Sequence, residues 1–277
     1  MVRPKQKRRA ALALVKGRKR SVARVCRALS LARSTFEYKS IKDLGPEIDL
    51  KKRLTELVER HRRWGLPRLH SILKKEGLVT NHKRTERIYR EENMQIRRRK
   101  RKKRSNILRV ARPAASKPNE VWSIDFVFDW VMTGRKLKCL TIVDDFTKES
   151  VAIFAAHSIS GQEVTRYLES IGRKPLRIRS DNGPEFISSA MFSWCGDQGI
   201  EHELITPGKP NENAFIESFN SRFRDECLNE HVFLNLNDAK TKISEWRKIY
   251  NEIHPHSSLG MKSPKEFARD YEIMLSA

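Results

Sequence analysis

Hydrophobic residues recur with two different periods along the chain, and the change falls near residue 120. Before it, apolar residues return every three or four positions, as on one face of an amphipathic helix. After it, runs such as Val121–Phe128 alternate between apolar and polar positions, which is typical of strands. The pattern therefore predicts a helical first part and a sheet-containing second part.

The second part is expected to be an α/β domain. Its predicted strands are Val121–Phe128, Lys136–Val143, Ser150–Ala155, Leu176–Ser180 and Ile200–Ile205. Its predicted helices are Gly161–Ile171, Ser188–Gln198, Ala214–Asn229 and Asn237–Asn251. Three strands in succession indicate an antiparallel meander, and the later alternation of helix and strand indicates a mixed sheet with helices packed on it.

The first part is expected to hold two small helical modules. Ser21–Ser30 and Ser34–Lys39 flank a short turn, with Ser34 as a cap of the second helix. This pattern is similar to a helix-turn-helix, and a helical hairpin without DNA contacts is the alternative. The second module comprises the predicted helices Ile48–Arg62, Pro67–Glu76 and His82–Glu92. Asn81 is a suitable N-cap for the last of them.

The last of these helices carries basic side chains, which include Lys83, Arg84, Arg87 and Arg90. Helices with such residues lie against DNA in many small modules. The alternative is a solvated helix face. The surplus of one sign favours contacts with phosphates.

Charge divides the chain in the same place as the hydrophobic pattern. Residues 1–120 carry 38 Lys and Arg against 11 Asp and Glu, a net charge of +27. Residues 121–277 carry 19 against 23, a net charge of −4, which leaves +23 for the whole chain. This separation predicts that the first part binds a polyanion and that the second part can bind cations. The expected segments are 1–45, 46–95, a basic linker at 96–119, and 120–277.

The linker contains eight consecutive basic residues: Arg97, Arg98, Arg99, Lys100, Arg101, Lys102, Lys103 and Arg104. Repulsion keeps such a run extended in the absence of DNA, and it lacks apolar groups for packing. Binding through several phosphates would make affinity fall steeply with salt. A solubilising linker or a localisation tag is the alternative to a tether that tracks DNA.

Other signals narrow the class of protein. The cysteines, Cys26, Cys139, Cys195 and Cys227, are widely spaced, which argues against a disulfide framework and against a zinc site. The apolar run Ala10–Val15 is too short for a signal peptide or a membrane span. We therefore expect a cytoplasmic protein associated with the nucleoid.

Three carboxylates in the second part are placed to share metal ions. Asp125 lies in a predicted strand, Asp181 ends another strand just before Asn182 and Gly183, and Glu217 opens a helix. Mg²⁺ accepts a few carboxylates from separate elements, and two ions about 3.5–4 Å apart suit attack on a phosphodiester. Singly, each residue also fits an ordinary strand end, a turn or a helix N-terminus.

Neighbouring polar residues are expected to have supporting roles. Asn182 and Gly183 shape the loop beside Asp181, with Gly183 in a backbone conformation that is costly for other residues. Glu185 is not expected to act in catalysis. Three further acidic residues fit a turn or the rim of the sheet, and one of two histidines in the tail fits hydrogen bonding rather than metal binding. These are Asp129, Asp144, Asp145, His254 and His256.

At these residues the sequence resembles a known family. The segments VWSIDFVFDW, KCLTIVDDFTKESVAI, IRSDNGPEF and PGKPNENAFIESFNSRFRDECLNEHVF resemble successive blocks of an integrase-type transposase core. Two further segments resemble other parts of the same proteins: the tail IYNEIHPHSSLGMKSPKEFA and the upstream RRWGLPRLHSILKKEGLVTNHKRTERIYREENMQIRRRKRKKR. The likeness, over roughly residues 20–270, is to the second-reading-frame (OrfB) protein of bacterial insertion sequences.

The resemblance implies a ribonuclease-H-like fold shared with retroviral integrases, with 120–277 as the catalytic core and its helical tail. It also implies a DDE triad with 35 residues between its last two members, which Asp125, Asp181 and Glu217 match. A basic residue seven positions past the glutamate is another family feature, and Arg224 fills it as a DNA contact. His254 departs from the family, in which Arg is common.

The implied activity is cleavage and strand transfer at the ends of a mobile element, with two Mg²⁺ ions or with Mn²⁺ as a substitute. The implied partners are double-stranded DNA (terminal inverted repeats and target), further copies of the chain on DNA, and an upstream helix-turn-helix protein as a fusion. The alternatives are a nuclease of the same fold, a non-enzymatic DNA-binding regulator, and an inactive transposase remnant.

Overall fold

The structure is a computed structural model that describes residues 4–18, 20–38, 45–96, 114–206 and 213–276. The chain divides into two compact units, Met1–Ile48 and Asp49–Ala277. The basic run Arg97–Arg104 lies outside the described residues. Among the described helices, none has the length and apolar character required to cross a membrane.

The first unit contains three helices: α1 (Pro4–Arg18), α2 (Val22–Ala28) and α3 (Arg33–Glu37). The sequence pattern predicts the last two but not α1. The hydroxyl of Ser21 caps α2 by accepting a hydrogen bond from the backbone N–H of Arg24. The prediction that Ser34 caps α3 is wrong, because the helix begins at Arg33 and the extended residue before it is Ala32.

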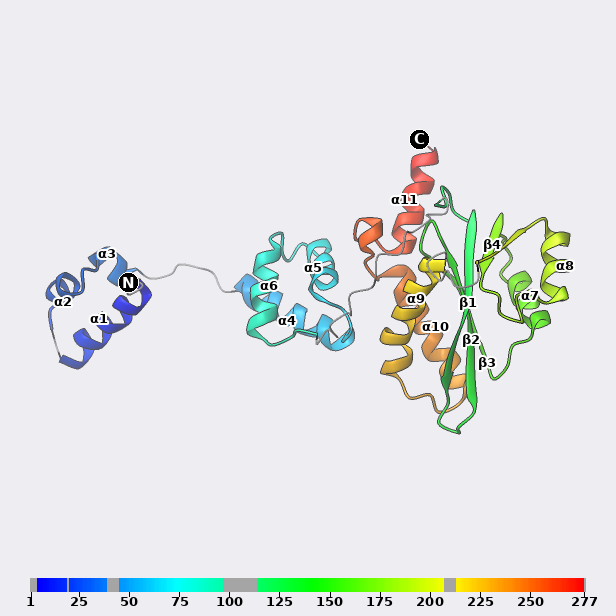
Figure 1. Cartoon of the computed structure of the whole chain (residues 1–277). Coiled ribbons are helices and arrows are strands. Elements are labelled where there is room, and N and C mark those ends of the chain that lie inside the picture. The colour runs from blue at the N-terminus through cyan, green and yellow to red at the C-terminus, as the bar shows by residue number, and fades with distance from the viewer. Residues whose placement is uncertain (1–3, 19, 39–44, 97–113, 207–212, 277) are drawn as a thin grey trace. The chain divides into compact units, whose positions relative to one another are not determined.

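The second unit begins with the predicted three-helix module. Its helices are α4 (Gly45–Arg60), α5 (Leu66–Lys75) and α6 (His82–Glu91) (Figure 1). Their apolar faces meet in a small core of buried residues, which includes Leu50, Leu54, Leu69, Leu73 and Ile88. Asn81 caps α6 as expected, since its side chain accepts from the N–H of Lys83 at 3.0 Å.

A five-stranded mixed sheet follows, in the order β3-β2-β1-β4-β5. The antiparallel strands are β1 (Val121–Trp130), β2 (Lys136–Asp144) and β3 (Ser150–Ala156). The shorter strands β4 (Arg177–Ser180) and β5 (Glu201–Leu204) run parallel to β1. The predicted fold class is confirmed, although β1 continues two residues past its expected end. Because β4 pairs only with the start of β1, the edge of β1 beyond Ser123 is not covered by that strand.

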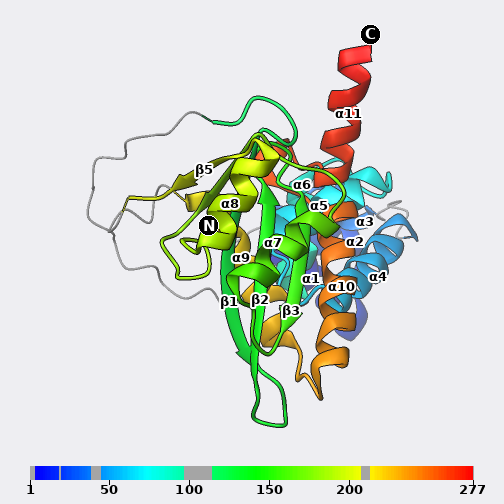
Figure 2. The same ribbon diagram turned by 90° about the vertical axis from the view of Figure 1, so that its right-hand side faces the viewer.

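Helices cover both faces of the sheet (Figures 1 and 2). On one face lie α7 (Gly161–Ser170) and α8 (Ser189–Gln198), and on the other lie α9 (Ala214–Glu226) and α10 (Leu236–Glu252). Each face has its own apolar layer. The helix α11 (Pro264–Ser276) follows in the tail. Alternation along β1 therefore sends successive side chains into different layers, which is what separates Asp125 from Phe126.

Candidate active site

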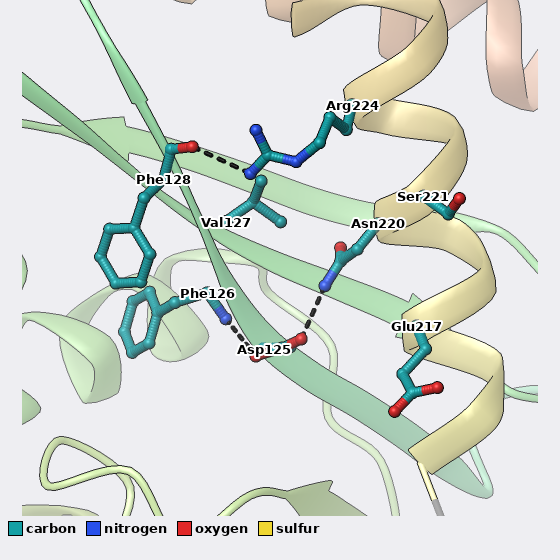
Figure 3. A pocket seen from close by; sticks show the side chains of 8 residues that line it. All are labelled: Asp125, Phe126, Val127, Phe128, Glu217, Asn220, Ser221 and Arg224. Atoms are coloured by element: carbon teal, nitrogen blue, oxygen red, sulfur yellow. Dashed lines mark hydrogen bonds between the residues drawn. The ribbon is translucent and has the colours of Figure 1, made fainter. Parts of the chain in front are cut away.

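Asp125 lies in the middle of β1 and faces α9. Residues at alternate positions of a strand share a face, and Val127, two residues on, packs in the layer beneath α9 and α10. The two carboxylate oxygens of Asp125 already accept hydrogen bonds. Oδ1 accepts from the N–H of Phe126 at 2.7 Å, and Oδ2 accepts from Nδ2 of Asn220 at 2.8 Å (Figure 3).

Glu217 reaches the same place from α9. In a helix, positions three, four and seven residues apart lie on one face, so Glu217, Asn220, Ser221 and Arg224 form a row that faces β1 (Figure 3). Together with four residues of β1 they line a cavity of about 340 Å³. The β1 residues are Asp125, Phe126, Val127 and Phe128. The structure thus brings together two of the three expected carboxylates and Arg224.

Asp181 directly follows β4, the strand that runs beside the start of β1. Its Oδ1 accepts from the N–H of Gly183 at 3.0 Å, which fixes the carboxylate at the strand end. Asp181 does not line the cavity. In the part of the chain that the structure describes, no three Asp, Glu, His or Cys side chains are close enough to hold one ion.

The three carboxylates are nevertheless coupled through their charges. Burial raises the pKa of Asp125 to about 6, and the negative charges of Asp181 and Glu217 add to the rise. Hydrogen bonds from Phe126 and Asn220 oppose it. Like charges that converge on one buried carboxylate are costly unless a cation accompanies them. This electrostatic arrangement is typical of a site that binds divalent cations.

The loop after Asp181 is held as the sequence suggests, but for a different reason at Gly183. Nδ2 of Asn182 donates to the backbone oxygen of Ile205 at 2.8 Å, which ties the loop to the end of β5. Gly183 is not among the described glycines with positive φ, so the predicted reason for glycine is wrong. A Cβ atom there would lie 3.0 Å from Oδ1 of Asp181. Glycine is therefore needed to leave room for that carboxylate.

The expected DNA-contact residues lie in different places. Arg224 extends across the open edge of β1, and its Nη2 donates to the backbone oxygen of Phe128 at 2.9 Å. On α6, Lys83 and Arg87 are exposed, whereas Arg84 is half-buried. These α6 residues do not line the cavity.

The remaining acidic residues have structural partners, as the sequence suggested. Asp144 accepts backbone N–H groups in the turn after β2, from Phe146 and Thr147. Asp145 forms an ion pair with Arg179 at 3.0 Å. The other two acidic residues also have partners. Asp129 accepts the N–H of Trp130, and Glu185 forms an ion pair with Lys138.

Both tail histidines, His254 and His256, are buried. His254 is 1% exposed, and its Nε2 lies 3.2 Å from Oε2 of Glu226 near the end of α9. Arg68 of α5 binds the other oxygen of the same carboxylate at 2.6 Å. His256 is also buried, and its ring packs against Tyr250. Glu226 is thus paired with both His254 and Arg68.

Sequence reasoning missed one residue of the cavity, Asn220. Its Nδ2 binds Asp125, while its Oδ1 accepts from the hydroxyl of Thr141 at 2.8 Å. Thr141 also donates to the backbone oxygen of Asp125. Asn220 lies three residues after Glu217 and so on the same face of the helix, but the sequence alone does not separate it from the other polar residues of that helix.

Comparisons with known proteins agree with this geometry. A model described as "Integrase core domain" matches residues 115–210, and a second with the same description matches residues 198–264. An "HTH-like domain" model matches residues 47–102. A chain of the simian T-cell lymphotropic virus intasome superposes with a TM-score of 0.51 at 16% identity, covering 78% of this chain and 74% of that one. That likeness concerns the fold alone. Fold and matches together define a protein of the integrase-core class.

Full-length relatives specify the family. An uncharacterized 39.2 kDa protein of insertion element IS476 from Xanthomonas euvesicatoria is 45% identical over 97% of this chain and 78% of its own length. The transposase for insertion sequence element IS904 from Lactococcus lactis is 24% identical over 79% of this chain and 93% of its own length. The chain belongs to the insertion-sequence transposases of the OrfB type. Its integrase-type core implies a polynucleotidyl transferase, and its helix-turn-helix-like domain indicates DNA binding.

Proposed function

We propose that the protein cuts the ends of an insertion sequence and joins each freed 3′-hydroxyl to another phosphodiester. The observation that carries this proposal is the coupling of Asp125 to both Asp181 and Glu217, in a protein of the transposase family. In the proposed route, one strand end attacks the same strand near the other end of the element. The nucleophile is a water or a hydroxyl of DNA, so no covalent link between protein and DNA is required.

The donor set of the site fits divalent cations. Each carboxylate oxygen has capacity for more than one partner, so the hydrogen bonds to Asp125 leave it able to bind a metal. Mg²⁺ is usually held by one or two carboxylates together with water and substrate phosphates. Such sites do not need three protein ligands around one ion. Asp125, Asp181 and Glu217 would hold two Mg²⁺ ions, or Mn²⁺ in their place.

When bound, these ions would supply Lewis acidity to the attacking and the leaving oxygen of an in-line displacement. The chain's own residues set the geometry. Asp125, Asp181 and Glu217 would hold these ions, and Asn220 holds the carboxylate of Asp125 in one orientation. Arg224, on the same side of α9 as Glu217, would contact a phosphate of the DNA end that is being processed.

The partner that this chemistry requires is double-stranded DNA, as terminal inverted repeats and as target. The helical modules would recognise the repeats, with Lys83, Arg84 and Arg87 of α6 among the contacts. The basic run Arg97–Arg104 would follow phosphates, which give affinity but little sequence discrimination. Two ends must be processed together, so we propose that several copies assemble on DNA. A frameshifted fusion with an upstream helix-turn-helix protein fits the OrfB type.

A labelled duplex that carries the terminal repeat tests this proposal. With Mg²⁺ or Mn²⁺ the wild-type protein should yield cleaved and joined strands, and Asp181→Asn should abolish both. Asp129→Asn, an acidic residue of β1 outside the cavity, is the matched control and should retain activity. Cleavage without joined products would indicate a nuclease. Joining by Asp181→Asn at the wild-type rate would exclude the catalytic assignment.

A further inference from the structure

Aromatic side chains follow one face of β1 as the strand leaves the covered part of the sheet. Phe126 is half-buried and stacks on Phe186, with ring centroids 4.9 Å apart. Farther along, Phe128 is 41% exposed and Trp130 is 62% exposed. Figure 3 shows the rings of Phe126 and Phe128 on the side of β1 away from Glu217. Two large exposed rings on a regularly paired strand form a contact surface in a fixed position.

The helices on this face of the sheet do not extend over these rings. In Figure 2 the β1–β2 hairpin continues well past α7 and α8. The coverage ends near Lys138, whose Nζ donates to the backbone oxygen of Ile159 just before α7 and pairs with Glu185. Phe128 lies opposite Lys138, at the limit of this coverage, and Trp130 lies beyond it along the hairpin.

Cations are interleaved with these rings. Trp130 pairs with Lys136 across the two strands, and Nζ of Lys136 lies 4.2 Å from the ring centroid of Phe128. Arg135 is exposed beside Lys136. We call Phe128, Trp130 and Lys136 the hairpin face. The nearest acidic residue of β1, Asp129, occupies the alternate position and therefore points to the other face.

The hairpin face adjoins the catalytic cavity. Phe128 lines that cavity together with Asp125 and Glu217. Trp130 follows Phe128 at about 7 Å along the strand, which is roughly twice the ~3.4 Å between stacked bases. The rings lie on the other side of β1 from Glu217. A DNA strand whose phosphate reaches the carboxylates would therefore reach the rings by crossing the edge of β1 that β4 leaves uncovered.

The rings also indicate which form of DNA is bound. Inside a duplex each base is covered by its neighbours, so an aromatic side chain stacks either on the terminal pair of a DNA end or on a base that has left the helix. Exposed aromatic residues on a sheet with basic residues between them are a common platform for single strands. We propose that the hairpin face stacks unpaired nucleotides next to the scissile phosphate. This inference rests on the proposed function and adds to it that the bound DNA end is locally unpaired.

Binding measurements on the full-length, metal-free protein test the inference. The probes are a blunt duplex and the same duplex with a short unpaired 3′ extension, both labelled for fluorescence anisotropy. Stacking should make the wild-type protein prefer the extended probe, and Trp130→Ala should weaken that complex about tenfold. Affinity for the blunt duplex should change less than about twofold. Trp130→Phe keeps a ring and should retain most of the preference.

Met132→Ala is the matched control, because Met132 is a 70% exposed apolar residue in the same hairpin without a ring. It should behave as wild type. Loss of intrinsic tryptophan fluorescence on adding the extended probe, absent in Trp130→Ala, should report the stack directly. Trp64, Trp122 and Trp246 are buried and Trp194 is half-buried, and all four remain in Trp130→Ala, which therefore measures their background signal.

Two results would overturn the inference. One is an equal affinity of wild type and Trp130→Ala for the extended probe. The other is a change in the sedimenting mass of the DNA-free protein upon Trp130→Ala, which would make the hairpin face a contact between copies. The strand-joining assay separates these outcomes from the proposed function. If the protein joins strands but shows no preference for unpaired ends, the stacking proposal alone is refuted. If it prefers unpaired ends but joins no strands, the proposed transposition chemistry alone is refuted.

Discussion

At the scale of single residues, the orientation of Asp125 depends on a neighbour that carries no charge. Asn220 donates one hydrogen bond to the carboxylate and accepts another from Thr141, so its side chain is fixed at both ends. A partner of this kind determines which carboxylate oxygens face the site. Asn220 is therefore expected to act as a positioning residue.

Replacing Asn220 by Ala should slow strand joining by roughly 10- to 100-fold, the usual loss when a partner behind a metal ligand is removed. The Mn²⁺ concentration for half-maximal activity should rise as well, because Asp125 would no longer be held in one orientation. Joined product is measured against Mn²⁺ concentration. Ser221→Ala, at the next position of the same cavity, serves as control. Wild-type metal dependence in Asn220→Ala would refute the positioning role.

The sequence could identify the charged members of the site but not this amide. Asp125, Asp181 and Glu217 stand out because carboxylates at such positions suit divalent cations, and the family likeness supplies their spacing. Asn220 is one of several polar residues on an amphipathic helix. Only the packing of α9 against β1 distinguishes it from the others. The sequence also singles out Gly183, but its need for space beside Asp181 depends on a distance that no pattern encodes.

At the scale of secondary structure, the short strand β4 has to place Asp181 beside β1. Arg179, two residues earlier, is 4% exposed and pairs with Asp145 and Glu203 at 3.0 Å each. Burial raises the pKa of Asp145 to about 6, with Arg179 opposing the rise. At pH 8 this carboxylate is therefore ionised. A buried charge of this kind depends strongly on its partner.

Arg179→Met should destabilise the protein by about 3–5 kcal/mol at pH 8, because it leaves the buried carboxylate of Asp145 without its ion-pair partner. Losing Arg179 raises the pKa of Asp145 further. The destabilisation should therefore shrink as the pH falls towards 5 and Asp145 takes up a proton. Urea unfolding at several pH values measures both effects. The double variant Arg179→Met with Asp145→Asn should recover part of the loss, and a pH-independent deficit would contradict the account.

Element boundaries show where local patterns succeed. Alternation located all five strands to within two residues, since one face of each is packed against helices. It ended β1 too early, because Asp129 and the exposed Trp130 interrupt the apolar pattern although the pairing with β2 continues. The local pattern likewise did not predict α1, which lies among polar residues. Cross-strand pairing and tertiary contacts decide such positions, and neither is visible in a local window.

At the scale of the whole molecule, positive charge and the carboxylates proposed to bind metal occupy different parts of the chain. The first 120 residues carry a net charge of +27, whereas the part with the sheet carries −4. We therefore expect that DNA affinity and the proposed reaction at one phosphodiester can be altered by separate substitutions. This separation was visible in the sequence, because it depends on composition and not on folding.

Replacing Arg97–Arg104 by a Gly-Ser linker of equal length should weaken DNA binding and flatten its salt dependence. The slope of log affinity against log salt should change by about 0.9 for each phosphate that the protein no longer neutralises. Affinity for a duplex is measured over a range of salt concentrations. Equal length keeps the reach between the flanking segments. An unaltered slope would show that the basic run does not contact DNA.

The central claim is that three acidic side chains, distant in sequence, bind one pair of divalent cations. Anomalous diffraction from crystals grown with Mn²⁺ and a DNA end tests this claim most directly. We expect two peaks roughly 2.0–2.3 Å from carboxylate oxygens of Asp125, Asp181 and Glu217, separated by about 3.5–4 Å. Ions bound elsewhere, or carboxylates that reach no common ion pair, would contradict the assignment of this protein as a metal-dependent strand transferase.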